Sequence, residues 1–201
     1  MDLVLATKNA HKIEEIKKIL NLGGIRYLTL NDFLGIPINE SGRTLAENSL
    51  IKASFTYKIT NQPTLADDSG LFIKALAGRP GIFSSRYGKN NEDRIQRVLD
   101  ELGAEKKRTA AFKVVFVYYH GPGRYEVFEG ECPGRIAWAP KGNHGFGYDP
   151  IFIPRGYRKT FAELGPAVKN RVSHRAVALR KFRKYLIKTT LNPPSPLKGE
   201  D

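Results

Sequence analysis

Two adjacent carboxylates, Asp67 and Asp68, close an apolar run in the sequence LADDSG (65–70) and precede Ser69 and Gly70. Side chains alternate along a strand, so the two carboxylates are expected to face opposite sides at a strand end and to have separate roles. One of them would hold a metal ion. The alternative is an Asp-rich turn in which both carboxylates accept hydrogen bonds from backbone N–H groups.

A polar corner near the N-terminus offers a second chemical feature. The sequence ATKNAHK (6–12) follows a short apolar run typical of a buried strand, and apolar residues at helical spacing follow it at 13, 16, 19 and 20. Unpaired N–H groups and the positive dipole end at the helix start would let Thr7, Asn9 and Lys12 bind phosphate oxygens. Alternatively, Asn9 only caps the helix and Lys12 is a solvated residue of its first turn.

A third polar segment, NESGRTLAENSLIKA (39–53), lies between these two. Thr44 and Glu47 have the spacing of a capping box at the start of a helix, so we interpret Glu47 first as a cap and only second as a site residue. Glu40 has no such structural explanation. Three polar corners of this kind are expected to meet in one site.

The remaining elements are read from hydrophobic periodicity and turn signals. Three helices are expected at 45–59, at 94–102 and from near 172 onward, the last with an apolar stripe and a solvated basic face. Strands are expected at 25–29, 109–120, 125–131 and 150–153, with a hairpin turn at 121–124. Alternating helices and strands with one hairpin predict an α/β domain around a mixed sheet.

Composition is consistent with one domain over residues 1–188, since 201 residues with 41% hydrophobic content can bury one sizeable core. The Pro-rich, polar segment 189–201 is expected to be a disordered tail. The single cysteine, Cys132, excludes an internal disulfide, and we find no signal peptide or membrane-spanning run, so the cytoplasm is the expected compartment. The formal charge of +13 favours anionic ligands.

Seven blocks of sequence, in order from about residue 3 to 186, resemble the inosine triphosphate pyrophosphatase family of house-cleaning enzymes. They are TKNAHK (7–12), ESGRTLAENSLIKA (40–53), LADDSGL (65–71), GRPGIFSSRYG (78–88), FEGECPGRI (128–136), GFGYDPIF (145–152) and KNRVSHRA (169–176). Leu45 and Ser49 depart from the usual residues of the family, but neither replaces a polar group. The resemblance implies a single α/β domain around a mixed, twisted sheet with flanking helices, and a site in a cleft between two lobes.

The same resemblance implies hydrolysis of non-standard purine nucleoside triphosphates (ITP, dITP and XTP) to the monophosphate and pyrophosphate. One Mg²⁺ per subunit, replaceable by Mn²⁺, would be held by Glu40 and Asp68, because magnesium prefers oxygen ligands and keeps several waters. In the family, the residue matching Asp68 also accepts a proton from the attacking water. We therefore expect a homodimeric hydrolase with no redox cofactor, no stable nucleic-acid partner and no membrane association.

Further residues are implied to contact the substrate or to support those that do. Asp67 would orient the site or share the metal, and Lys52 would add a positive charge near the phosphates unless it is only a surface residue. The implied substrate contacts are Thr7, Lys8, Asn9, Ala10, His11, Lys12, Ser69, Phe146, Gly147, Tyr148, Asp149, Lys169, His174 and Arg175.

The sequence GFGYDP (145–150) is the candidate for base recognition, since glycines let the backbone approach a ligand and Phe146 and Tyr148 supply flat faces. Without the family, this segment would be interpreted as a tight turn with core aromatics. His174 and Arg175 match the family's residues on the base side. A donor aimed at O6 would accept hypoxanthine and xanthine but leave a buried donor unpaired against adenine.

Two alternative functions follow from other features. The charge of +13, Arg86, Tyr87 and the basic last helix are compatible with a nucleic-acid-binding module, although no RNP-like or KH-like motif is found. A general nucleotide phosphatase would release phosphate instead of pyrophosphate.

Overall fold

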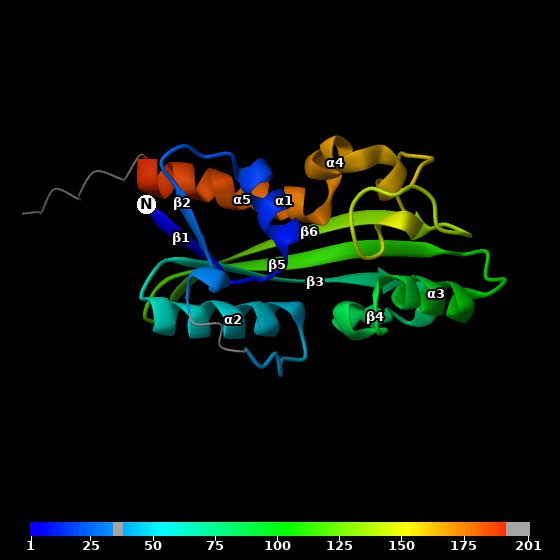
Figure 1. Ribbon diagram of the computed structural model, residues 1–201, viewed down its shortest axis with the longest axis horizontal. Helices are drawn as coiled ribbons and strands as arrows, with labels where there is room; N and C mark the ends of the chain where they lie inside the picture. The colour runs from blue at the N-terminus through cyan, green and yellow to red at the C-terminus, as the bar shows by residue number, and fades with distance from the viewer. Residues whose placement is uncertain (34–37, 192–201) are drawn as a thin grey trace, which may run out of the picture.

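A mixed seven-stranded sheet runs through the centre of the computed structural model, which describes residues 1–33 and 38–191 (Figure 1). Its order is β2-β1-β3-β5-β6-β7, and β4 pairs only with β3. The strands are β1 (Asp2–Leu5), β2 (Arg26–Thr29), β3 (Thr64–Ile73), β4 (Pro80–Gly81), β5 (Thr109–Gly121), β6 (Arg124–Ile136) and β7 (Phe152–Pro154). Strand β1 is parallel to both of its neighbours, whereas every other pairing is antiparallel. The predicted α/β class and mixed sheet are therefore confirmed.

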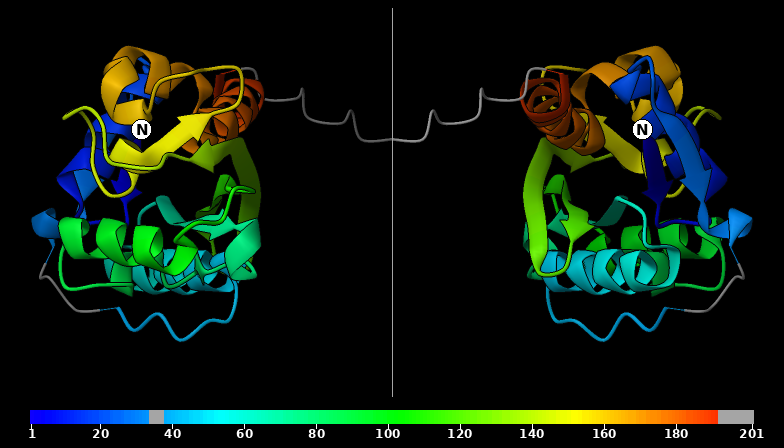
Figure 2. Two further views of the ribbon diagram at one scale, coloured as in Figure 1. Left: turned by 90° about the vertical axis from the view of Figure 1, so that its right-hand side faces the viewer. Right: turned by 90° about the vertical axis from the view of Figure 1, so that its left-hand side faces the viewer.

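Helices cover both faces of the sheet (Figures 1 and 2). Helices α1 (Ala10–Leu20), α4 (Phe161–Val172) and α5 (His174–Leu186) lie on one side, and α2 (Leu45–Thr60) and α3 (Asn91–Leu102) lie on the other. Each helix starts after a polar residue whose side chain accepts a backbone N–H bond from the first turn, which offsets the unpaired donors there. These residues are Asn9, Thr44, Asn90, Thr160 and Ser173.

Two large apolar clusters stabilise the fold on either side of the site. One packs the helix face of α1 and α5 against β1, β3, β5 and β6, with Leu3, Ile16, Phe116 and Phe182 fully buried. The other joins the far end of β3 and β5 to α3 and to Phe152 and Phe161. A fully buried aliphatic or aromatic side chain contributes about 1.5–3 kcal/mol. The polar segments of interest therefore sit between two well-packed regions.

Some predicted boundaries were wrong. The carboxylates Asp67 and Asp68 do not close a strand at a Ser-Gly corner, because β3 continues to Ile73 and pairs with β5 along its whole length. Gly70 permits this: a Cβ at this position would overlap the carbonyl of Gly81 in β4. The segment predicted as a strand at 150–153 instead begins with the 3-10 turn η4 (Asp149–Ile151), so β7 starts at Phe152.

The last helix was predicted within two residues of its observed start, since α5 begins at His174 after its cap Ser173. The helix before it, α4, ends at Val172. Helix α4 was not predicted because Gly165, which has a non-helical conformation, and Pro166 interrupt its pattern. The predicted stripe of α5 is buried and its basic face is exposed, as expected.

The C-terminal part of the described chain continues the last helix. Residues 187–191 continue α5 as a short π-helical turn, η5 (Ile187–Leu191), and the rest of the predicted tail, 192–201, lies outside the described residues. Residues 34–37, between the strand expected at 25–29 and the helix expected at 45–59, also lie outside them. Among residues 1–33 and 38–191, no helix has both the length and the apolar character needed to cross a bilayer.

Gly130 in β6 allows a close approach of helix α5. A Cβ at this position would overlap the carbonyl of His174 and contact the backbone of Ala178. We expect Gly130→Ala to lower the free energy of unfolding by about 1–3 kcal/mol, since α5 would have to move away from the sheet. Urea unfolding would measure this. Gly23→Ala is the matched control, because a Cβ there meets nothing within 4 Å, and an equal loss in both variants would contradict the expectation.

Candidate active site

A pocket of about 520 Å³ opens beside residues 68–71 of β3. The β1–α1 corner, α2, β3, the loop before η4, and the starts or ends of α4 and α5 all contribute to its walls. Most of the predicted site residues line it: Thr7, Lys8, Asn9, His11, Lys12, Glu40, Lys52, Asp68, Ser69, Phe146, Gly147, Tyr148, Asp149, Lys169, His174 and Arg175. Ala10, Glu47 and Asp67 do not line it. A larger pocket elsewhere contains none of the predicted residues.

Asp67 and Asp68 face opposite sides of β3, as their alternation predicts. Asp67 is buried toward α1 and α5, where Lys12 Nζ donates a hydrogen bond to Asp67 Oδ2 at 2.8 Å. Burial by itself raises the pKa of Asp67, but Lys12, Arg175 and Lys52 together hold that pKa below its ordinary value. Asp67 is therefore a buried anion that holds cationic side chains in place, rather than a group at the pocket surface.

Asp68 points toward α2 and forms the acidic part of the pocket with Glu40. Lys52 Nζ lies 3.0 Å from Glu40 Oε1 and 3.9 Å from Asp68 Oδ1. Asn48 Nδ2 donates a hydrogen bond to Asp68 Oδ2 at 3.1 Å. Burial raises the pKa of the Asp68 carboxyl, although Lys52 and Asn48 favour its charged form. Two carboxylates thus converge on one cation.

Lys52 is not the surface residue of the alternative interpretation. Only 7% of it is exposed, and its ammonium lies beside the carboxylates of Glu40 and Asp68. Glu47, in contrast, is a structural residue: its Oε2 accepts the backbone N–H of Arg43 at 2.6 Å, while Thr44 Oγ1 accepts that of Glu47. In a capping box, Glu47 would accept the backbone N–H of Thr44, whereas here it accepts that of the preceding residue, Arg43.

The β1–α1 corner combines structural and possible binding roles. Asn9 is the cap of α1, with its Oδ1 accepting the backbone N–H of Lys12, and Thr7 Oγ1 accepts the N–H of Asn9. The cap interpretation of Asn9 is therefore correct. Lys12 is not simply solvated, since its ammonium is paired with Asp67 at the pocket wall. Ala10 is the first residue of the helix.

The opposite end of the pocket is built around a buried ionic network. Lys169 Nζ lies 2.5 Å from Asp149 Oδ2 and 2.7 Å from Glu15 Oε1, and Arg175 Nη1 donates to Glu15 Oε2 at 3.0 Å. Arg175 Nη2 also donates to Ser69 Oγ at 3.1 Å. These contacts fix the cationic side chains of α4 and α5 against α1 and β3.

Phe146 lies at the centre of this end of the pocket. Its ring stacks on His11 with centroids 5.0 Å apart, and Lys169 Nζ lies 4.1 Å from its centroid. The backbone N–H of Phe146 donates to Asp149 Oδ2 at 2.8 Å, so Asp149 fixes the loop. Tyr148 is largely a core residue, since it is buried and its hydroxyl donates to the carbonyl of Ser84. The turn and core interpretation is thus correct for Tyr148, whereas Phe146 is a pocket residue.

His174 is fully enclosed and stacks on Phe112 with ring centroids 4.9 Å apart. Burial, reinforced by Arg175, Lys169 and Lys12, lowers its pKa well below the ordinary value, so the imidazole is neutral near pH 7. Within the described residues, His174 Nδ1 has no hydrogen-bond partner. A buried polar atom without a partner is costly, and a ligand in the pocket could supply one.

The lowered pKa of His174 gives a pH prediction. The unfolded chain takes up a proton at His174 below about pH 6.5 while the folded chain does not, so folding stability falls by up to about 1.4 kcal/mol per pH unit below that point. We expect His174→Gln to remove this contribution. Denaturant unfolding between pH 7.5 and 5.5 would measure it. A pH dependence identical in the two proteins would show that His174 is protonated in the fold.

Sequence reasoning missed several residues in and around the pocket. Glu15 and Asn48 contact lining residues from behind the wall, and both had a signal: Glu15 lies one helical turn after Lys12, and Asn48 one turn before Lys52. Ser84, Ser85, Asn91 and Arg94 line the pocket itself. Within the segment 78–88, Phe83 is exposed and Tyr87 is buried and hydrogen-bonded to Glu101, so Tyr87 offers no free face to a nucleic-acid base.

Comparison with known proteins assigns the chain to a family. The model of the Ham1 family matches residues 3–185. The chain is 45% identical over 185 residues to a protein from Lactiplantibacillus plantarum named dITP/XTP pyrophosphatase, covering 90% of this chain and 92% of that protein. It is 47% identical over 182 residues to a Prochlorococcus marinus protein of the same name, covering 90% and 94%.

Solved structures give the same result. A HAM1 protein from Coxiella burnetii superposes with a TM-score of 0.88 at 38% identity, covering 94% of this chain and all of that one. The Staphylococcus aureus Ham1 protein gives 0.84 at 35% identity, covering 92% and 98%. The chain therefore belongs to the Ham1 family.

Proposed function

We propose that this protein hydrolyses the non-standard purine nucleoside triphosphates ITP, dITP and XTP to the nucleoside monophosphate and pyrophosphate. One observation carries the proposal. A single pocket joins a pair of carboxylates and several ammonium groups at one end to an aromatic ring, a neutral imidazole and a guanidinium at the other. The relatives named dITP/XTP pyrophosphatase support the same reaction and substrate class.

The phosphates would lie at the end formed by the β1–α1 corner, Lys12 and Lys52. The start of α1 offers backbone N–H groups and the positive end of the helix dipole. Lys12 and Lys52 each already contact a carboxylate, so their positions are fixed before the substrate enters. Such preorganised charge stabilises the anionic transition state of phosphoryl chemistry.

Glu40 and Asp68 would hold the Mg²⁺ ion, or Mn²⁺ in its place. The donor set fits, because two carboxylates already share one cation, the Lys52 ammonium. No group of three or more His, Cys, Asp or Glu side chains comes together within residues 1–33 and 38–191, so water and phosphate oxygens would complete the shell, as Mg²⁺ prefers. When bound, the ion would neutralise phosphate charge and lower the pKa of a bound water.

Asp68 would accept the proton of the water that attacks the α-phosphorus, with pyrophosphate as the leaving group. Its burial favours this role, since a raised pKa makes a carboxylate a better base near neutral pH. The hydrogen bond from Asn48 keeps the carboxylate oriented. Asp67 would act indirectly, by fixing Lys12 and Arg175.

The purine would stack at Phe146, with His174 and Arg175 reading its edge. A buried donor directed at O6 matches hypoxanthine and xanthine, whereas the amino group of adenine would leave that donor unpaired. Lys169, predicted to contact the substrate, lies at this end over the Phe146 ring, so we assign it to positioning Asp149 and the base loop.

Product analysis tests the proposal. With Mg²⁺, ITP, dITP and XTP should give the monophosphate and pyrophosphate, and ATP and GTP should react far more slowly. Release of phosphate and IDP would indicate a general phosphatase. Equal cleavage of all five would contradict the base-recognition part, and no turnover would leave nucleic-acid binding as the better hypothesis.

The cytoplasmic location remains a prediction of the sequence pattern, and the homodimer remains a prediction of the resemblance. Analytical ultracentrifugation would test the oligomeric state, with a single species of twice the 22.5 kDa chain mass as the expected result. Phe83, which is 57% exposed beside the pocket, is an exposed apolar side chain that such an interface could cover. A monomer at all concentrations would contradict the prediction.

A further inference from the structure

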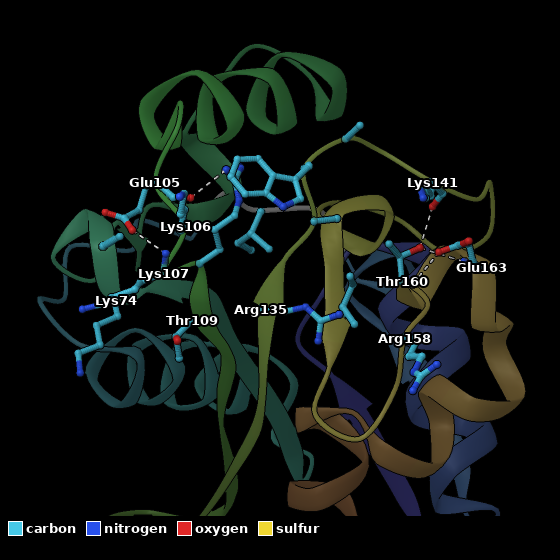
Figure 3. A pocket seen from close by; sticks show the side chains of 17 residues that line it. Lys74, Glu105, Lys106, Lys107, Thr109, Arg135, Lys141, Arg158, Thr160 and Glu163 are labelled. Atoms are coloured by element: carbon cyan, nitrogen blue, oxygen red, sulfur yellow. Dashed lines mark hydrogen bonds between the residues drawn. The ribbon is translucent and has the colours of Figure 1, made fainter.

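The larger pocket, about 770 Å³, lies apart from the candidate active site, and the two share no lining residue (Figure 3). It lies beside the start of β5, the end of β6, the loop that follows β6 and the cap of α4. A cavity of this size accommodates a drug-sized ligand. None of the residues used in the proposed reaction contributes to its walls.

The walls of this pocket are strongly basic. Seven lining side chains are cationic and two are acidic. The cationic ones are Lys74, Lys106, Lys107, Arg108, Arg135, Lys141 and Arg158. In Figure 3, Lys74 and Lys107 lie to the left of Arg135, and Arg158 lies to its right. The lining cations therefore come from more than one side.

Ion pairs within the described part of the chain do not neutralise this charge. Among the described residues, none of the seven cations lies within 4.0 Å of a carboxylate oxygen in an ion pair. The two acidic side chains are used locally: Glu163 accepts the backbone N–H of Thr160, and Glu105 accepts that of Lys107. Unpaired cations around a concave surface concentrate anions there.

One flat aromatic surface stands in the same pocket. Trp138 is 62% exposed, which is unusual for so large an apolar side chain. The Arg108 guanidinium lies 4.2 Å from its ring centroid. Arg108 itself is buried and donates hydrogen bonds to the carbonyls of Gly103 and Glu105. Its guanidinium is therefore held in place and in turn positions the indole ring. An exposed indole of this kind stacks well on a nucleobase.

We propose that this pocket binds a free nucleoside polyphosphate, with its base on Trp138 and its phosphates among Lys107, Arg135 and Arg158. A free nucleotide is favoured over a nucleic-acid strand because strands are bound along a series of aromatic side chains. Of the described residues that line this pocket, Trp138 alone is aromatic. The site is thus a second nucleotide site, separate from that of the proposed hydrolysis.

Trp138 is the single tryptophan of the chain, so its fluorescence reports on this pocket directly. The probe is ATP in EDTA, which prevents hydrolysis, at about 0.1 M salt, where the Debye length is roughly 10 Å. We expect saturable quenching. Lys107→Gln/Arg135→Gln should weaken binding roughly tenfold or more, as expected for charge-assisted contacts. The matched control is Lys58→Gln/Lys89→Gln, which removes the same charge from exposed lysines elsewhere and should leave binding unchanged.

Two further measurements separate the possible ligands and sites. Lys12→Ala in the candidate active site should leave the quenching by ATP unchanged. Calorimetry with Trp138→Ala should show weaker binding of ATP but not of tripolyphosphate. Absence of saturable quenching, equal losses in the two double variants, equal affinity for tripolyphosphate and ATP, or tighter binding of oligothymidylate would each overturn the proposal.

Discussion

Asp68→Asn is expected to lower the rate of ITP hydrolysis by roughly 10²–10⁴-fold, the range typical for loss of a general base. Asparagine keeps the shape of the side chain but cannot accept a proton from water, and it removes one of the two carboxylates that converge on Lys52. Initial rates of pyrophosphate release from ITP with Mg²⁺ would measure the effect. The change should appear in kcat, because the lost interaction acts in the transition state.

The fold should survive this substitution. Asn48 donates its hydrogen bond to Asp68 Oδ2, and an amide oxygen can accept the same bond. Asp100→Asn, on the exposed face of α3, is the control for loss of one negative charge and should retain full activity. If Asp68→Asn kept a rate within about threefold of the wild type, well below the general-base range, the proton acceptor would have to be another group.

Lys169→Met is expected to give the largest loss of stability, about 3–5 kcal/mol, because it leaves buried carboxylates without their cation. Among the described residues, Asp149 would lose its one ammonium partner, and Glu15 would retain Arg175 alone. For a chain of this size each kcal/mol corresponds to about 2–4 °C, so the melting temperature should fall by roughly 6–20 °C. Differential scanning fluorimetry would measure this.

A double variant identifies the cause of that loss. If the cost comes from the uncompensated Asp149 carboxylate, Lys169→Met/Asp149→Asn should be more stable than Lys169→Met alone. Burial already raises the pKa of Asp149, so the single variant should also recover part of its stability in acid, where that carboxyl is protonated. Loss of stability that is additive in the double variant would indicate that Lys169 acts mainly through packing.

Local patterns predicted most of the architecture. The strand, turn and helix at the N-terminus, the helix after Thr44 and the long hairpin all follow from periodicity and from turn or cap residues. Prediction failed where long-range pairing overrode a local signal. Ser69 and Gly70 have the composition of a turn, yet they lie within a strand because β5 pairs with β3 on both sides of them.

The roles of individual polar residues were less predictable. Asp67 and Asp68 are neighbours of the same type, but one is a buried partner of Lys12 and the other lies in the pocket. The opposite directions of their pKa shifts depend on helices that are distant in the sequence: α1 and α5 supply cations to Asp67, and α2 supplies the environment of Asp68. Glu15 was overlooked because its spacing from Lys12 does not reveal its contacts with Lys169 and Arg175, which are far away in the sequence.

The class of the fold, the family resemblance and the polar segments of the pocket could be predicted from residue types and short-range spacing. Which charges pair is visible only in the folded chain, since Lys169 with Asp149, Arg175 with Glu15 and Lys52 with Glu40 join different elements. The tertiary structure also brought Trp138 together with basic residues from several segments. Burial and distance, which set charge and pKa, exist only once the chain is folded.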